Sequence, residues 1–127
     1  DEITVEQLPE LWNQKMEEYL GITPTTLAEG VLQDIHWSQG SFGYFPTYAL
    51  GSAYSAQFYH TLEKHVDINT DLLAGDLTNI TAFLAEHIHQ YGKSKTPKEI
   101  IFDTTGENFD SAHYTSYLID KYKKMFG

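Results

Sequence analysis

Apolar residues recur at intervals of three and four along most of the chain, and no run alternates apolar and polar residues for long enough to indicate a strand. Intervals of three and four place side chains on one face of an α-helix, whereas a half-buried strand requires strict alternation. The pattern therefore predicts an all-α fold. The chain has 127 residues and no internal repeat or low-complexity tract, so a single helical region over residues 1–127 is expected.

Capping residues indicate where the helices begin and end. Thr4 and Gln7 have the spacing of a capping box, and Gly21 is suited to end the helix that follows. The same signals predict a helix over residues 27–37 and another from Pro46 to Val66. A further helix is expected from Asn69 or Thr70 to about Tyr91, with Gly75 as a weak point. The last two are expected from the capping box of Thr96 and Glu99 to Gly106, and from about Asp110 into Met125.

The composition argues against several classes of function. Eight Lys and Arg residues stand against eighteen Asp and Glu, and the resulting charge of -10 has the wrong sign for phosphates or anionic lipid. The chain contains no cysteine, which excludes a disulfide, a thiolate metal site and a Cys nucleophile. No apolar run approaches the roughly 20 residues of a membrane span. We therefore expect no nucleic-acid or membrane partner, and a cytoplasmic location.

One short segment concentrates polar and aromatic side chains. Gln33, Asp34, His36 and Trp37 fall within five residues, and tyrosines follow closely at positions 44 and 48. Imidazole and phenol groups donate hydrogen bonds that suit a developing oxyanion or a substrate carboxylate. The alternative is a partly buried histidine with ordinary hydrogen bonds beside packing tyrosines. On a regular helix Asp34 and His36 diverge by about 200°, so Asp34 should not orient His36 unless the backbone is irregular there.

The sequence offers no recognisable metal ligands. The zinc motif HExxH is absent, and the segment from Glu86 to His89 resembles it only in composition. The histidines outside the polar segment are badly spaced for sharing one metal ion, so structural or surface roles are expected for them: His60, His65, His87, His89 and His113. No metal-binding residue is predicted.

The segment from Gly30 to Trp37 matches the motif GxxQDxHW at every fixed position, and this motif is typical of the carboxypeptidase Taq family of zinc metallocarboxypeptidases. The stretch from Gly43 to Gly51 also resembles the sequence that follows the motif in that family. Further segments are similar as well: residues 8–21, 84–92 and 105–122. The resemblance covers essentially the whole chain but only the C-terminal portion of the family's chain.

This resemblance implies metal-dependent removal of C-terminal amino acids from peptides with broad preference. Members of the family are homodimers with a mostly helical fold, which is similar to the folds of neurolysin and angiotensin-converting enzyme. Its HExxH motif and its zinc, or another divalent metal, belong to the region that precedes this one. The chain is thus expected to be a helical C-terminal subdomain that is inactive alone, with a peptide substrate and the remainder of the parent chain as partners.

The resemblance also assigns roles to residues. His36 is expected to hydrogen-bond the substrate backbone and the tetrahedral intermediate. Tyr44 and Tyr48 are expected to bind the oxyanion and the C-terminal carboxylate, without an assignment of which does which. Gln33, Asp34 and Trp37 are expected to shape and support the site rather than to perform chemistry.

Two other functions are compatible with the residues alone. The chain could be a free-standing acidic helical protein-interaction domain that binds a partner through the aromatic stretch 42–59. A small hydrolase built on His36 and Asp34 is disfavoured, because no Gly-x-Ser-x-Gly turn supplies a nucleophile. If the chain is a stable unit by itself, its helices must close a core without the upstream chain, and exposed apolar surface that is open to self-association is then expected.

Overall fold

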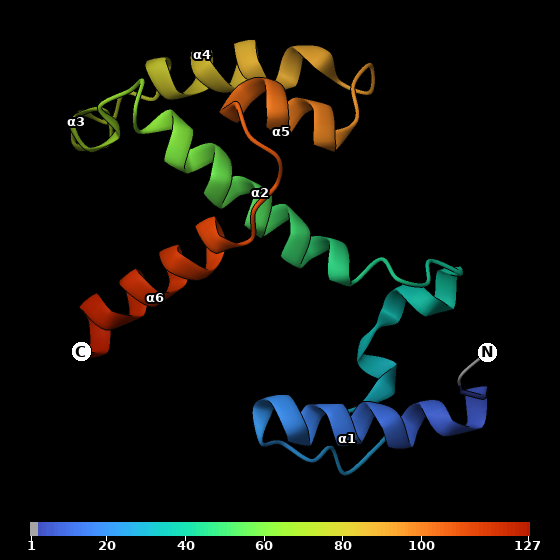
Figure 1. The fold of residues 1–127 in the computed structure, drawn as a ribbon. Helices are drawn as coiled ribbons and strands as arrows, with labels where there is room; N and C mark the ends of the chain where they lie inside the picture. Colours follow the sequence, from blue (N-terminus) through green and yellow to red (C-terminus); the bar gives the residue numbers. More distant parts are fainter. Residues whose placement is uncertain (1–2) are drawn as a thin grey trace. The chain divides into compact units, whose positions relative to one another are not determined.

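The computed structural model describes residues 3–127, and these contain helices and no strand (Figure 1). The predicted all-α fold is therefore confirmed. In order, the elements are the 3₁₀-helix η1 (Val5–Gln7), α1 (Leu8–Leu20), the 3₁₀-helices η2 (Val31–Gln33) and η3 (Ile35–Gln39), α2 (Pro46–Leu62), α3 (Ile68–Ala74), α4 (Thr78–His87), the 3₁₀-helix η4 (His89–Tyr91), α5 (Pro97–Thr105) and α6 (Ala112–Phe126). None of the described helices is both long and apolar enough to cross a membrane.

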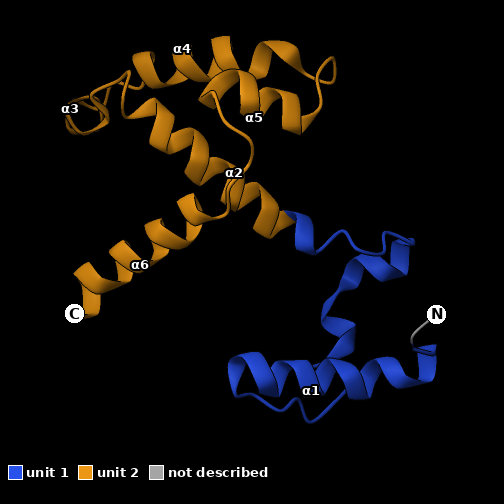
Figure 2. Cartoon of the chain, in the orientation of Figure 1, with its two compact units in different colours: residues 1–47 blue, residues 48–127 orange. Residues whose placement is uncertain are grey.

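The chain divides into two compact units, residues 1–47 and residues 48–127 (Figure 2). The first unit contains α1 and the two 3₁₀-helices that carry the polar and aromatic segment. The second unit contains nearly all of α2 and every later helix. The expectation of one helical region over residues 1–127 stays a prediction, because compactness alone does not establish how many units fold independently.

The first predicted helix forms, but its first turn is the 3₁₀-helix η1 and the α-helix α1 begins at Leu8. The backbone N–H of Thr4 donates to the side-chain Oε1 of Gln7 at 2.8 Å, so the capping box forms over η1. Gly21 ends α1 in the left-handed region, with φ 66°. Helix α1 contacts η2, and Trp12 of α1 meets Trp37 of η3 edge to face with ring centroids 6.4 Å apart. These contacts form the packing of the first unit.

The prediction of one helix over residues 27–37 is wrong. The backbone forms two short 3₁₀-helices, η2 and η3, which are separated at Asp34 with ψ 87°. The cause is local, because the Asp34 side chain accepts a hydrogen bond from the backbone N–H of His36 and thereby caps η3. Aspartate commonly offers the backbone this alternative to a continuous helix. The polar segment is consequently an irregular turn rather than one helix face.

The prediction of one continuous helix from Asn69 or Thr70 to about Tyr91 is also wrong. Gly75 adopts φ 69° and ends α3, so α4 begins separately at Thr78. The N-cap of α3 is Asp67, whose carboxylate accepts from the backbone N–H and the hydroxyl of Thr70 at 3.2 and 2.8 Å. These two bonds lower the pKa of Asp67. Gly75 was the weak point in the pattern, and its left-handed backbone breaks the helix.

Helix α5 confirms its predicted signals at both ends. The carboxylate of Glu99 accepts from the backbone N–H and the hydroxyl of Thr96 at 2.8 and 2.7 Å, which completes the capping box. The backbone N–H of Thr96, followed by its hydroxyl, holds the pKa of Glu99 below its usual value. Gly106 ends the helix with φ 78°. Helix α5 packs against α4, which in turn contacts η4.

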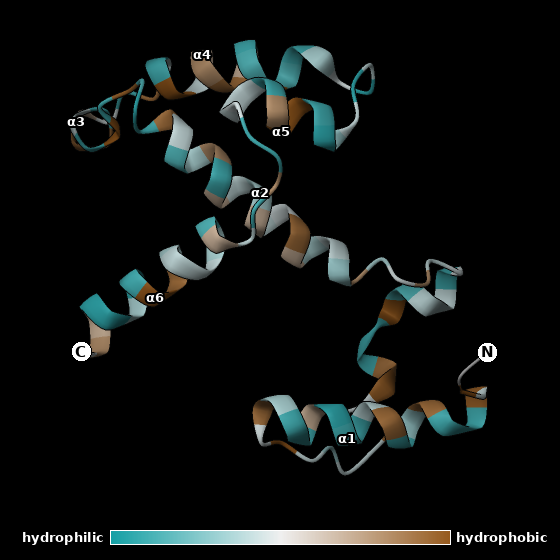
Figure 3. Cartoon of the chain, viewed as in Figure 1, coloured by the Kyte–Doolittle hydropathy of each residue, from teal (hydrophilic) through white to brown (hydrophobic). Residues whose placement is uncertain are grey.

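The second unit has a small apolar core and much apolar surface. Leu62, Ile68 and Phe83 form the buried cluster where α2, α3 and α4 meet. Helix α6 has no buried residue, although hydrophobic side chains recur along it (Figure 3). Tyr117, for example, is 46 % exposed and Met125 is 59 % exposed. The expectation of exposed apolar surface is therefore confirmed.

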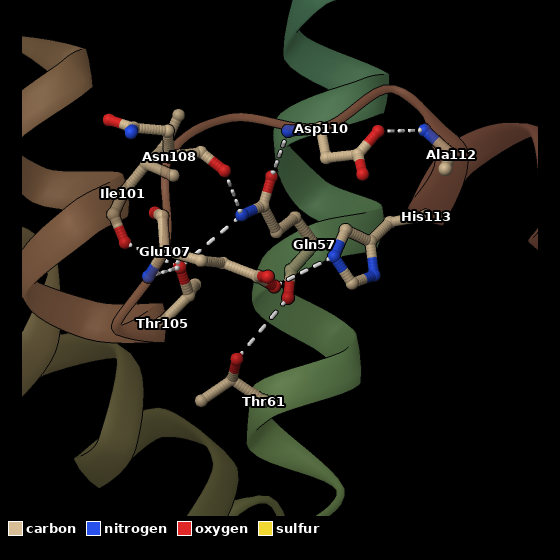
Figure 4. A network of polar contacts seen from close by, with 9 residues as sticks. All are labelled: Gln57, Thr61, Ile101, Thr105, Glu107, Asn108, Asp110, Ala112 and His113. Atoms are coloured by element: carbon tan, nitrogen blue, oxygen red, sulfur yellow. Dashed lines mark hydrogen bonds and ion pairs between the residues drawn. The ribbon is translucent and has the colours of Figure 1, made fainter.

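A buried amide ties α2 to the connection between α5 and α6 (Figure 4). The side chain of Gln57 is completely buried, and its Nε2 donates to the carbonyl of Asn108 at 3.1 Å and to the hydroxyl of Thr105 at 3.3 Å. Its Oε1 accepts from the backbone N–H of Asp110 at 3.0 Å. One side chain thus satisfies both an acceptor and a donor of the connecting backbone.

We expect Gln57→Leu to lower the free energy of unfolding by about 1–3 kcal/mol, because it leaves the Asn108 carbonyl and the Asp110 N–H without their partner. Urea denaturation followed by circular dichroism measures the change. Ser55→Ala is the matched control, since its hydroxyl bonds only within α2 to the carbonyl of Gly51. Equal stability of the two variants would refute the role of Gln57.

Candidate functional site

The segment from Gly30 to Trp37 lies in the first unit, and it begins at a glycine that packs closely against the side chain of Asn13. Gly30 is buried, and its N–H donates to the carbonyls of Thr26 and Leu27 at 3.1 and 3.2 Å. A Cβ at this position would lie 2.8 Å from Oδ1 of Asn13 and 3.4 Å from Cβ of Pro24. The absence of a side chain therefore lets the segment pack against α1.

Asp34 binds His36 through a single carboxylate oxygen. Its Oδ1 accepts from the backbone N–H of His36 at 3.1 Å and lies 2.7 Å from the ring nitrogen Nδ1 of the same residue. Asp34 is buried with 6 % exposure, and the His36 side chain is 20 % exposed. The expectation that Asp34 would not orient His36 held only for a regular helix. The irregular backbone at Asp34 brings the two side chains together instead.

The turn after η3 brings Tyr44 back to His36. Gly40 caps η3 with φ 74°, and the N–H of Ser41 donates to the carbonyl of His36 at 3.0 Å. The ring of Tyr44 then lies 4.7 Å from the His36 ring, measured between centroids. The imidazole and one of the two phenols singled out in the sequence are thus neighbours. Tyr44 is 48 % exposed, so this cluster faces outward from the first unit.

Phe45 is a member of the cluster that the sequence reasoning did not single out. Its ring lies 5.5 Å from that of His36, on the residue next to Tyr44. The signal was the tract from Gly43 to Pro46, where a turn precedes a helix and consecutive aromatic side chains cannot both point into a core. Its apolar ring flanks the imidazole.

Gln33 and Trp37 make supporting contacts. The side-chain Nε2 of Gln33 donates to the backbone carbonyl of Ala28 and so holds the loop before η2. Trp37 lies between Trp12 and Phe42, with ring centroids 6.4 and 5.8 Å away. Neither contact involves the imidazole, which agrees with a structural contribution from both residues.

Tyr48 belongs to the second unit. It lies in the first turn of α2, four residues after Tyr44 in the sequence, and is 57 % exposed. The helix that carries it contains the fully buried Gln57, whose bonds hold α2 to the rest of residues 48–127. Its phenol is therefore presented by a helix with a fixed position in its own unit.

Within residues 3–127 there is no group of three or more His, Cys, Asp or Glu side chains placed to hold a metal ion. The nearest approach is in a groove between α2 and α6 of the second unit, which contains His60, His113 and Glu107. There the rings of His60 and His113 are 5.1 Å apart, and Nε2 of His113 lies 2.8 Å from Oε1 of Glu107. No local pattern predicts this contact, because it depends on the fold of the segment between α5 and α6. The described residues do not fit a metal centre.

Residues 1–122 match the sequence model of the carboxypeptidase Taq (M32) metallopeptidases. The chain belongs to this family. Among curated proteins, Carboxypeptidase 1 of Bacillus subtilis is 47% identical over 127 residues, which are 99% of this chain and 25% of that protein. Thermostable carboxypeptidase 1 of Pyrococcus furiosus is 42% identical over 123 residues, which are 96% of this chain and 25% of that protein. The family expected from the motif is confirmed.

Solved structures of M32 carboxypeptidases have the same fold over this region. The M32 carboxypeptidase of Deinococcus radiodurans is 31% identical with a TM-score of 0.91, over 98% of this chain and 26% of that one. Metallocarboxypeptidase 1 of Trypanosoma cruzi is 39% identical with a TM-score of 0.89, over 95% of this chain and 26% of that one. This M32 chain thus spans about a quarter of the length of its relatives.

We expect Gly30→Ala to destabilise the first unit by about 1 kcal/mol, because the added methyl group overlaps Oδ1 of Asn13 and that side chain must move aside. Thermal unfolding of the variant measures the loss. The double variant with Asn13→Ala should recover part of it, since the overlapping atom is then gone. Strictly additive effects of the two substitutions would show that the close approach is not the cause.

Proposed function

We propose that this chain supplies substrate and transition-state contacts to a metal-dependent carboxypeptidase that removes C-terminal amino acids from peptides with broad preference. Membership of the M32 family supports the reaction class, and the share of about a quarter of each relative supports a part of an enzyme rather than a whole one. The observation that carries the proposal is the His36 ring, which lies 4.7 Å from Tyr44 and 2.7 Å from the carboxylate of Asp34.

The proposed catalytic residues are His36, Tyr44 and Tyr48. Peptide hydrolysis passes through a tetrahedral intermediate whose oxygen becomes negative, and a carboxypeptidase must also bind the carboxylate at the end of its substrate. Phenol groups meet both needs as hydrogen-bond donors, while an imidazole either donates from a protonated ring nitrogen or accepts from the substrate backbone. Such bonds are worth most where water is excluded. Phe45, 5.5 Å from His36, supplies apolar surface beside them. Gln33, Asp34 and Trp37 are proposed to shape and support the part of the site around His36.

The metal is proposed to lie in the remainder of the parent chain. Residues 3–127 do not fit a metal centre, so no step at His36 or Tyr44 is assigned to a metal ion. Zinc is our first choice and another divalent cation the second; one solved relative, the carboxypeptidase of Pyrococcus furiosus, is described as an Apo-Mg form. The homodimer remains a prediction from the family resemblance, and the cytoplasmic location remains a prediction from the composition.

An acidic protein-interaction domain is the second candidate function. The aromatic stretch 42–59 is exposed at several positions, including Phe42 at 71 %, Tyr48 at 57 % and Tyr59 at 45 %. Exposed aromatic side chains are typical of protein interfaces. The family match weighs against this reading, because residues 1–122 match a family of enzymes.

A comparison of this chain with one extended to the length of its relatives tests the proposal. Metal content and the release of the C-terminal amino acid from a blocked dipeptide are measured for both. We expect the 127-residue chain to be inert and to bind no stoichiometric zinc, and the extended chain to bind metal and cleave. Cleavage or stoichiometric zinc binding by the short chain alone would contradict the proposed division of the site.

In the extended enzyme, we expect His36→Ala to lower kcat by about 10²- to 10³-fold. One of the two variants Tyr44→Phe and Tyr48→Phe, the one that removes the oxyanion donor, should lower kcat by a similar factor. The metal content should stay unchanged, because none of the three residues is a proposed ligand. Tyr117→Phe in α6 removes a phenol that is 46 % exposed and serves as the control. Wild-type turnover in all of the His36, Tyr44 and Tyr48 variants would disprove the assignment.

A further inference from the structure

The bond between Asp34 and His36 constrains which ring nitrogen of His36 carries a proton. A neutral imidazole has one N–H and one bare nitrogen, and an ionised carboxylate only accepts hydrogen bonds. Oδ1 of Asp34 lies 2.7 Å from Nδ1 of His36 and also accepts from the backbone N–H of His36 at 3.1 Å. A bare Nδ1 at that distance would place two lone pairs against each other.

Burial of the Asp34 carboxylate strengthens this constraint. The side chain of Asp34 is only 5 % exposed, so water cannot fully replace a lost hydrogen bond. A buried carboxylate without donors is costly, and the N–H at Nδ1 is one of the two donors that Oδ1 receives here. In water a neutral histidine instead favours the form with its proton on Nε2. The site therefore works against the form that the side chain prefers in solution.

We propose that Asp34 is a positioning residue that fixes neutral His36 with its proton on Nδ1, so that the ring meets a peptide substrate through Nε2. The contact with a peptide rests on the proposed carboxypeptidase function, whereas the position of the proton does not. In this form Nε2 accepts a hydrogen bond, and the natural partner is a backbone N–H of the substrate. Donation from Nε2 to an oxyanion requires the doubly protonated ring, while a phenol such as that of Tyr44 donates in its ordinary neutral form.

The same chain contains a histidine with the opposite geometry. His113 approaches the carboxylate of Glu107 through Nε2, at 2.8 Å from Oε1. By the same argument neutral His113 carries its proton on Nε2. The two histidines therefore form an internal pair in which the carboxylate contacts different ring nitrogens.

The shared oxygen of Asp34 allows a variant that separates charge from geometry. In Asp34→Asn the backbone N–H of His36 still requires an acceptor, so the amide oxygen should occupy the place of Oδ1 and keep the proton on Nδ1. Asp34→Leu keeps the number and branching of the side-chain heavy atoms and removes the acceptor. The asparagine variant should behave as wild type in tautomer, and the leucine variant should not.

Long-range proton–nitrogen correlation spectra of the chain labelled with nitrogen-15 histidine test the inference, at about pH 8.5, well above the ordinary histidine pKa of about 6.5. We expect an N–H at Nδ1 of His36 and at Nε2 of His113. Asp34→Asn should keep the His36 signature, and Asp34→Leu should move it to Nε2. A proton on Nε2 of wild-type His36, or a bare Nδ1 in the asparagine variant, overturns the proposal, and both remain measurable if the leucine variant does not fold.

Activity of the extended enzyme separates this inference from the proposed function. We expect Asp34→Asn to retain kcat/KM within about threefold and Asp34→Leu to approach the loss of His36→Ala, about 10²-fold or more. Loss in His36→Ala without loss in a folded Asp34→Leu would overturn the role of Asp34. A fully active His36→Ala together with the expected spectra would instead sink the function of His36 and leave the tautomer assignment standing.

Discussion

The geometry of the candidate site depends on the carboxylate of Asp34. Because this side chain accepts the N–H of His36, the backbone leaves the helical path between η2 and η3. Because the helix is interrupted there, Nδ1 of His36 also lies within hydrogen-bonding distance of Oδ1 of Asp34. The turn at Gly40 then places the ring of Tyr44 beside the imidazole. A continuous helix would have kept Asp34 and His36 on different faces. One short-range hydrogen bond thus determines both the local fold and the surroundings of the imidazole.

Each fixed residue of the GxxQDxHW motif has a physical reason in this arrangement. Gly30 leaves room for Asn13, and the amide of Gln33 holds the preceding loop. Trp37 anchors the segment between two other aromatic rings, while Asp34 holds His36. In the proposed function, the imidazole is the one side chain of the motif that contacts the substrate. Most of the motif therefore secures the position of one side chain, as expected where a small displacement of a reacting group is costly.

The accuracy of the sequence predictions followed the range of the interactions involved. Helices α1 and α5 were predicted well, since capping boxes and terminal glycines act within a few residues. The contact between Asp34 and His36 was missed because periodicity assumes a regular backbone, and a side chain that competes for a backbone N–H breaks that assumption. The bonds of Gln57 to residues more than forty positions away lay beyond any local pattern. The candidate site residues were predicted from the family motif, and their distances and contacts could be read from the structure alone.

The aromatic packing of the first unit has a spectroscopic consequence. The chain contains two tryptophans, Trp12 and Trp37, and both lie in residues 1–47 with their rings in edge-to-face contact. Intrinsic tryptophan fluorescence therefore originates in this unit, while the far-ultraviolet signal of the helices comes from both. Trp37 also adjoins His36 in sequence. The chain consequently carries a native optical probe next to its candidate site, with no label needed to follow that region apart from residues 48–127.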